Sequence, residues 1–336
     1  MTALITSDLH LDDNAQNADR WNLFLWLKRQ IQKYEVDQLL ILGDLTDSKD
    51  RHAAPLVNRI VRTLQELSEQ VEVIVLMGNH DFISENTPFF GFLDDKTQDR
   101  NLTFVTKPTE IVVQGSSALF LPCTRTWEKA YGKLDFKPFK FIFCHQTFDG
   151  AIAENGIGLR GINPGIFSGS SARIYAGDIH VPQKVNKQIE YVGSPYHVRF
   201  GDTFKARVIL LEGKAKDLYF PFRGREVIII RNLDDLSKKD FILGTQVKIK
   251  VRLKRSEFPE WPILRKEIKA LVGRKGWELC GLSLEKMKTK DRVVEDEETI
   301  HTAGTPEDIL ETYAKKKKLN KRMVQAGKMF IEEAMK

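Results

Sequence analysis

The chain contains 336 residues, and 42% of them are hydrophobic, so it can bury a sizeable core. This composition excludes an intrinsically disordered chain, and no apolar stretch reaches the length that spans a bilayer. The first apolar run begins at Ala3 with no basic leader before it, so we expect a cytoplasmic protein without membrane contact. Cys123, Cys144 and Cys280 lie far apart without metal-ligand spacing, which favours free thiols in apolar surroundings.

Basic charge is concentrated in the later part of the chain. The net charge is +6, but residues 204–290 alone hold 22 Lys and Arg against 11 Asp and Glu. Such a surplus suits a surface that binds a polyanion, because neutralising phosphates releases condensed counterions. A solvated, lysine-rich face would give the same count, and both interpretations stay open at this stage.

The first third of the sequence alternates strand and helix patterns. Short apolar runs at 3–5, 39–42 and 71–76 predict buried strands that end in polar turns. Between them, the stripe from Trp21 to Ile31 and the segment 56–67 have the period of amphipathic helices. This order predicts a parallel, layered α/β sheet, in which polar residues just past the strands gather at one edge.

Further strand-like runs predict a second sheet packed on the first. These runs lie at residues 103–105, 110–113, 118–121, 139–144, 173–176 and 190–192. The segment 148–171 is rich in Gly, Asn and Ser, so we expect it to form a surface loop near the site.

A separate, small α/β pattern begins at Arg225. Strand and helix patterns alternate at residues 226–230, 234–240, 246–253, 261–272 and 277–284. Trp261 and Trp277 of this segment could stack on bases, but burial in its small core is the simpler expectation. We therefore expect a larger α/β domain at 1–222, a small α/β domain at 223–292, and C-terminal helices at 303–336.

Five polar clusters each follow an apolar run. They are Asp8-Leu9-His10, Gly43-Asp44, Gly78-Asn79-His80-Asp81, Cys144-His145 and Gly177-Asp178-Ile179-His180. One such cluster alone would indicate a turn, whereas five at the expected edge of one fold indicate a site. Carboxylate, amide and imidazole groups without thiolates are typical ligands of borderline-hard divalent metals.

The order D-x-H, G-D, G-N-H-D, H and G-x-x-H resembles the calcineurin-like metallophosphoesterase superfamily. The segment 191–195, which reads Tyr-Val-Gly-Ser-Pro, is similar to that of the SbcD-type nuclease subunits. Specific motifs carry the resemblance to about residue 203, and architecture alone carries it beyond that point. The resemblance implies a two-sheet layered catalytic domain with outer helices at 1–222 and a small capping or DNA-binding domain at 223–292. It also implies terminal helices at 303–336, in a phage or bacterial member.

The resemblance also implies a site for two divalent ions, with Mn²⁺ preferred and Mg²⁺ as the second choice. The implied ligands are Asp8, His10, Asp44 and His180 for one ion and Asp44, Asn79, His145 and Asp178 for the other. Asp44 would bridge the ions, which would clamp the scissile phosphate and activate a water as nucleophile.

His80 is implied to be a catalytic residue instead of a ligand. It would steady the phosphate and protonate or position the leaving oxygen. Asp47, three residues past the bridging carboxylate, is our candidate for orienting His80. The alternative role for Asp47 is a helix cap before Ser48.

Asp178 departs from the usual family pattern G-H-x-H, in which an imidazole stands at this position. A third carboxylate beside Asp8 and Asp44 favours hard ions such as Mn²⁺ or Mg²⁺ over zinc and polarises water less. Two alternatives stay open: Asp178 weakens the second site until substrate binds, or it is only a turn residue after Gly177.

The resemblance favours a DNA exo/endonuclease that works with an SMC-like ATPase of the SbcC type in break processing, recombination or replication. It implies double-stranded ends and single-stranded or hairpin DNA as substrates, and a homodimer as the assembly. The terminal helices, with apolar residues such as Ile309, Leu310 and Met323, would bind the ATPase or pack back on their own domain.

Two other functions use the same residues differently. A generic metallophosphatase or cyclic-nucleotide phosphodiesterase would need neither the basic segment nor the partner-binding helices. A scaffold that has lost activity is the third possibility, and the metal-competent side chain at every ligand position counts against it.

Overall fold

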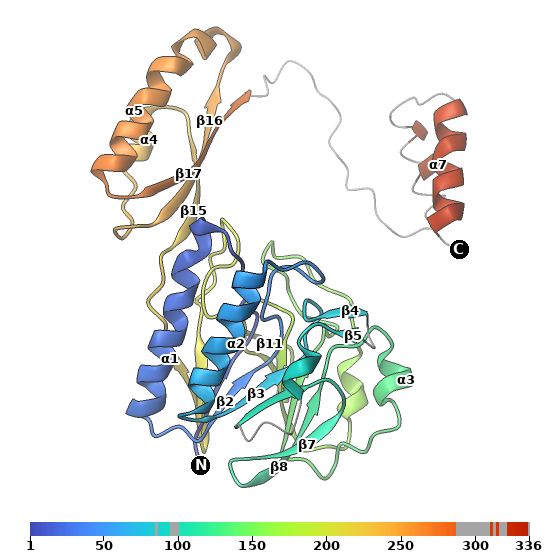
Figure 1. Ribbon diagram of the computed structural model, residues 1–336. Coiled ribbons are helices and arrows are strands. Elements are labelled where there is room, and N and C mark those ends of the chain that lie inside the picture. Colours follow the sequence, from blue (N-terminus) through green and yellow to red (C-terminus); the bar gives the residue numbers. More distant parts are fainter. Residues whose placement is uncertain (85–86, 95–100, 287–309, 312–313, 316–320, 335–336) are drawn as a thin grey trace. The chain divides into compact units, whose positions relative to one another are not determined.

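The computed structural model describes residues 1–84, 87–94, 101–286, 310–311, 314–315 and 321–334 (Figure 1). The chain forms two compact units, Met1–Glu285 and Lys286–Lys336. In the second unit, helix α7 (Lys321–Ala334) lies where the last terminal helix was predicted. The predicted apolar residue Ile309 lies outside the described residues. Within the described part of the chain, no helix combines the length and the apolar character needed to cross a membrane.

The first sheet has six strands in the order β14-β13-β1-β2-β3-β6. Their bounds are β1 (Ala3–Thr6), β2 (Gln38–Ile41), β3 (Glu72–Leu76), β6 (Leu102–Val105), β13 (Val208–Glu212) and β14 (Lys214–Leu218). Strands β1, β2, β3 and β6 are parallel to one another, and β13 pairs antiparallel with β1. The three predicted strands of the first third are therefore neighbours and end at the same edge of the sheet.

The second sheet also has six strands, in the order β11-β12-β10-β9-β8-β7. Their bounds are β7 (Thr109–Val113), β8 (Ser116–Leu121), β9 (Phe141–His145), β10 (Arg173–Gly177), β11 (Gln183–Lys184) and β12 (Ile189–Tyr191). Strands β8, β9, β10 and β12 are parallel, as the strands at the centre of the first sheet are. The prediction of a second, packed sheet is confirmed except for the run 103–105. That run forms β6 of the first sheet, beside β3, because an apolar run shows a strand but not which sheet the strand joins.

Alternating side chains of the first sheet face two different cores. Ile5 and Leu40 pack with Phe120 of the second sheet, so one core lies between the sheets. Leu4 and Leu39 point the other way, toward the helices. Helices α1 (Asn22–Lys33) and α2 (Ala54–Ser68) cover that face (Figure 1). The period of two in these strands thus produces the predicted layers of helices and sheets.

A third core lies on the outer face of the second sheet. There, Leu119 and Ile142 pack against Trp127 of the short helix α3 (Trp127–Tyr131) and against Phe167 of η3 (Pro164–Phe167). The remaining small elements near the site are η1 (Ala15–Trp21), β4 (Phe82–Ser84), β5 (Thr87–Pro88) and η2 (Gly91–Asp94).

Residues 225–286 form a three-stranded sheet, β15-β16-β17, with helices on one face. The elements are β15 (Arg225–Ile230), α4 (Leu233–Ser237), β16 (Gln246–Leu253), η4 (Arg255–Glu260), α5 (Trp261–Arg274) and β17 (Glu278–Lys286). Trp277 is buried among Ile249 and Ile268, and its indole Nε1 donates to the Phe241 carbonyl at 3.3 Å. Core packing, the simpler expectation for Trp277, is therefore what the structure shows.

The hairpin of β13 and β14 was not predicted from the sequence. The run Val208–Leu211 is fully buried beside β1, and its partner strand continues after a turn at Gly213, whose φ is +67°. The partner strand, Lys214–Leu218, has polar residues at most positions, which hides its strand character in a hydrophobicity pattern.

Candidate metal centre

The predicted site residues lie just past the carboxyl ends of five parallel strands. Asp8 and His10 follow β1, and Asp44 follows β2. Asn79 and His80 follow β3, His145 is the last residue of β9, and Asp178 and His180 follow β10. Parallel strands bring these residues, which are up to 172 positions apart, to one edge where the two sheets meet.

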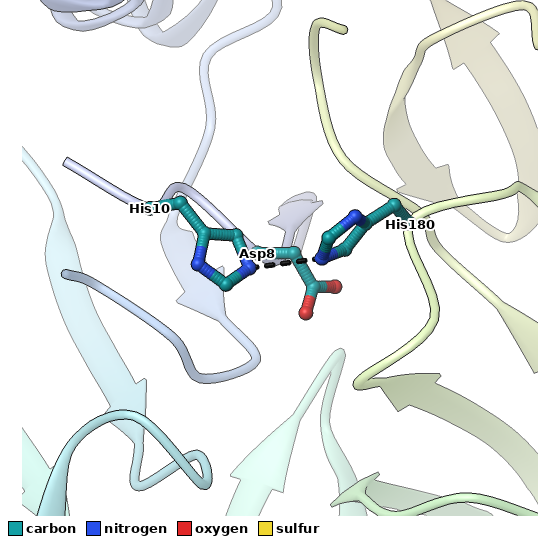
Figure 2. Close-up of side chains that lie close together, drawn as sticks. All are labelled: Asp8, His10 and His180. Carbon is teal, nitrogen blue, oxygen red and sulfur yellow. Dashed lines mark hydrogen bonds between the residues drawn. The ribbon is translucent and has the colours of Figure 1, made fainter. Parts of the chain in front are cut away.

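Asp8, His10 and His180 point toward one another (Figure 2). The Nε2 atoms of His10 and His180 are 2.9 Å apart, and each residue offers a ligand atom within 4.8 Å of those of the other two. All three side chains are buried. Two ring nitrogens that face each other beside a carboxylate form an arrangement that can hold a metal ion.

Asp44 connects this group to the other predicted ligands. Its Oδ2 lies 3.6 Å from His10 Nε2, and its Oδ1 lies 3.4 Å from His145 Nε2. Asp8, Asp44 and His145 form a second group whose ligand atoms lie within 4.8 Å of one another. The two oxygens of Asp44 therefore face different histidines, as a shared ligand requires.

Asp178 turns its carboxylate toward the second group. Its Oδ1 accepts a hydrogen bond from Asn79 Nδ2 at 3.3 Å and lies 3.9 Å from His145 Nε2. The hydroxyl of Thr147 donates to its other oxygen. Asp178 thus lies in the cluster as well as in a turn, where its φ is +88°.

Five buried polar atoms of the cluster make no hydrogen bond to the described residues. These atoms are Asp8 Oδ2, His10 Nδ1, Asn79 Oδ1, His145 Nε2 and His180 Nδ1. A buried polar atom without a partner costs about 1–3 kcal/mol, so such atoms require compensation. Each atom is an oxygen or nitrogen of a predicted ligand residue. Because none is sulfur, these residues fit hard or borderline divalent cations.

The backbone around the cluster is held in an uncommon conformation. Asp8, His10, Asp44 and Asp178 all have positive φ, at +56°, +42°, +56° and +88°. In the described part of the chain, only Glu35 and Gln114 share this feature among residues other than glycine. Positive φ costs about 1–3 kcal/mol at such residues and concentrates at functional sites, which supports this edge as the site.

The carboxylates and imidazoles of the cluster strongly perturb one another. Burial opposes ionisation of Asp44, but the charges of His145 and His10 outweigh it and hold the pKa of Asp44 well below its usual value. Burial also lowers the pKa of His145, and the carboxylate of Asp44 reverses this and raises that pKa well above its usual value. Positive charge therefore stabilises the ionised carboxylates, and protons and metal ions compete to provide it.

Asp81 is a buried residue of the site whose role could not be predicted from its motif. Its Oδ2 accepts from the backbone N–H groups of Asp44 and Gly78 at 2.7 and 2.8 Å, and its Oδ1 accepts from Leu45 at 2.9 Å. Burial, and then the charge of Asp44, raise the pKa of Asp81 to about 7. The carboxylate of Asp81 thereby connects two turns, the one that contains Asp44 and the one that contains Asn79.

We expect Asp81→Asn to destabilise the fold by about 3 kcal/mol, because the amide nitrogen would face a backbone N–H at either oxygen position. Urea unfolding monitored by circular dichroism measures the loss. The control is Asp13→Asn at an exposed carboxylate, which should leave the unfolding midpoint unchanged. Equal midpoints for the Asp81 variant and the parent would contradict this role.

Glu154 is a second residue that the sequence did not single out. It comes from the loop after β9, and its Oε1 lies 2.7 Å from His180 Nδ1. This contact leaves His180 Nε2 to face His10 and Asp8. A carboxylate behind a ligand imidazole fixes the ring and its tautomer and increases its basicity.

We expect Glu154→Gln to weaken Mn²⁺ binding by about 10- to 100-fold while leaving the fold intact. Calorimetric titration of the metal-free protein with MnCl₂ measures this change. Glu128→Gln, at an exposed helix position, is the control. Unchanged Mn²⁺ affinity would show that Glu154 does not position His180.

Asp47 and His80 lie beside the cluster. His80 Nδ1 lies 2.5 Å from the backbone carbonyl of Asp47, whereas the Asp47 carboxylate lies 3.4 Å from His10 Nδ1. Asp47 therefore contacts His80 through its main chain. It does not cap a helix within the described residues, because α2 begins at Ala54 with Ala53 as its N-cap. His80 also forms a group with His10 and Asp44 whose ligand atoms lie within 4.8 Å of one another.

Part of the chain is similar to a known protein family. Residues 1–151 match the calcineurin-like phosphoesterase family. This match makes the first 151 residues similar to calcineurin-like phosphoesterases, and the groups of side chains that could hold a metal agree with it. No curated protein matches the chain. The narrower resemblance to SbcD-type nucleases stays a prediction.

Three solved structures are among those that are similar to part of this chain. An archaeal phosphodiesterase has 9% identity and a TM-score of 0.36, over 66% of this chain and 100% of its own. The nuclease MPE of Pseudomonas putida has 15% identity and a TM-score of 0.34, over 64% and 87%. The phosphoesterase YfcE of E. coli has 16% identity and a TM-score of 0.32, over 63% and 88%. Similarities at this level do not transfer a substrate.

Proposed function

We propose that this protein is a metal-dependent DNA nuclease of the SbcD type, which hydrolyses phosphodiester bonds with two divalent ions, Mn²⁺ above all. The observation that carries the proposal is Asp44, whose two oxygens face His10 and His145 in two adjoining groups of ligands. One ion would bind Asp8, His10, Asp44 and His180, and the other Asp44, Asn79, His145 and Asp178.

When bound, the ions supply Lewis-acid stabilisation of the phosphate and activation of water. The protein supplies an imidazole for proton transfer. His80 Nδ1 must carry a proton, because the Asp47 carbonyl that it contacts can only accept a hydrogen bond. His80 Nε2 is therefore the atom that exchanges a proton, and the protonated ring can donate it to the leaving oxygen.

The choice of DNA as substrate is supported by the basic segment of the chain. A groove of about 540 Å³ on the three-stranded sheet and α4 is lined by Arg231, Lys238, Lys239 and Arg252, with Asp235 as its only carboxylate. Arg252 is partly neutralised by Glu285 at 3.1 Å. The remaining cations suit contacts with a phosphate backbone.

The proposed protein partner is an SMC-like ATPase of the SbcC type, bound by the C-terminal helices. In α7, Met323 and Met329 are 58% and 63% exposed. Exposed, flexible thioether side chains on an amphipathic helix suit a partner groove. A homodimer of the catalytic domain is part of the same proposal.

A generic metallophosphatase or cyclic-nucleotide phosphodiesterase would use the same centre. The substrates that the protein cleaves therefore distinguish a nuclease from these enzymes. We expect the full chain with Mn²⁺ to degrade linear duplex and hairpin DNA, with lower activity in Mg²⁺ and higher activity when the ATPase partner is added. Cleavage of DNA is followed on gels, and bis(p-nitrophenyl) phosphate and p-nitrophenyl phosphate report diester and monoester hydrolysis. Hydrolysis of the small esters without any cleavage of DNA would contradict the nuclease and favour the generic enzyme.

A further inference from the structure

A cavity of about 390 Å³ opens beside the candidate metal centre. Asn79 and Asp178 line one side of it and also belong to the centre. A volume in the range of about 300–1,000 Å³ is typical of sites that bind small molecules. The cavity therefore has room for one small group next to the position where the reaction is proposed to occur.

The lining of this cavity combines cations with apolar surface. Lys49 and Arg125 supply positive charge, and Asp178 is the only carboxylate of the lining. Lys49 is exposed and makes no ion pair to any described residue. The Arg125 guanidinium carbon lies 5.9 Å from the centre of the Phe82 ring. Cations and apolar side chains in one lining suit a ligand that is both anionic and flat or apolar.

We propose that this cavity is a nucleotide subsite, which holds the nucleotide next to the scissile phosphate. The neighbouring phosphate lies against Lys49 and Arg125, and the nucleoside lies against the apolar side chains of Phe82 and Ile162. The inference rests on the proposed phosphodiesterase function. Because phosphates recur at every nucleotide of a strand, a second phosphate contact beside the centre would distinguish a nucleic acid strand from a simple phosphate ester.

The test measures binding by calorimetry, with the 336-residue protein in a chelator so that no metal contributes. The probe is thymidine 3′,5′-bisphosphate, with thymidine and inorganic phosphate as the two comparison ligands. We expect the bisphosphate to bind more tightly than either comparison ligand. Lys49→Glu and Arg125→Ala should each weaken it by at least about tenfold, whereas Lys107→Glu, at an exposed lysine outside the cavity, should not.

Equal binding by the parent and both cavity variants, or binding no tighter than that of inorganic phosphate, would overturn the subsite. Melting temperatures show whether each variant is folded, and Lys49 is an exposed residue. The result is independent of catalysis. A protein that binds the bisphosphate but cleaves no ester would refute the proposed function alone, and one that cleaves DNA without this binding would refute the subsite alone.

Discussion

Replacement of Asp44 by alanine is expected to abolish the binding of two Mn²⁺ ions and to lower hydrolysis by at least about 1,000-fold. This factor corresponds to about 4 kcal/mol of the activation barrier. The reason is the position of Asp44: its oxygens lie 3.6 Å from His10 Nε2 and 3.4 Å from His145 Nε2, so its loss affects both groups of ligands. Calorimetric titration with MnCl₂ gives the stoichiometry, and hydrolysis of bis(p-nitrophenyl) phosphate gives the rate.

The control for Asp44 is Asp13→Ala, which removes an exposed carboxylate and should change neither stoichiometry nor rate. Asp44 Oδ1 also accepts from the His80 backbone N–H at 2.8 Å, so circular dichroism is needed to show that the variant is folded. A folded Asp44→Ala protein that still binds two Mn²⁺ ions with the parent affinity would contradict a shared carboxylate.

His80→Ala is expected to lower cleavage by about 100- to 10,000-fold while the protein keeps two bound Mn²⁺ ions. The argument rests on the contact of His80 Nδ1 with the Asp47 carbonyl, which leaves Nε2 for proton transfer. The same titration and the same ester assay measure both quantities on one preparation.

The metal stoichiometry of His80→Ala is as informative as its rate, because His80 also lies within reach of a group with His10 and Asp44. Loss of one Mn²⁺ together with activity would make His80 a ligand and remove its role in proton transfer. Retention of full activity would remove His80 from the mechanism altogether.

The strands and the clusters of the site could be predicted because their signals are local. Each buried strand is a short apolar run, and each cluster follows its run directly, as Asp44 follows β2 and Asn79 follows β3. Because parallel strands end at the same edge of a sheet, the clusters could be predicted to lie together before any distance was known. The departure at Asp178 was visible for the same reason.

Supporting residues could not be predicted because their partners are distant in the sequence. Asp81 binds the backbone of Asp44, 37 residues earlier, and Glu154 reaches His180 from a loop whose sequence indicates only an irregular surface segment. An Asp after a metal motif or a Glu in a loop has no periodic signal of its own. Only the folded backbone shows which carboxylate meets which imidazole, and it also shows Asp47 contacting His80 through a carbonyl.

The most direct test of the central claim is a crystal of the protein soaked in MnCl₂ and measured at a wavelength where manganese scatters anomalously. We predict two peaks that share Asp44, one between His10 and His180 and the other beside His145 and Asp178. A difference map without a peak between these side chains, from a crystal in which they are well ordered, would contradict the two-metal centre and the phosphodiesterase built on it.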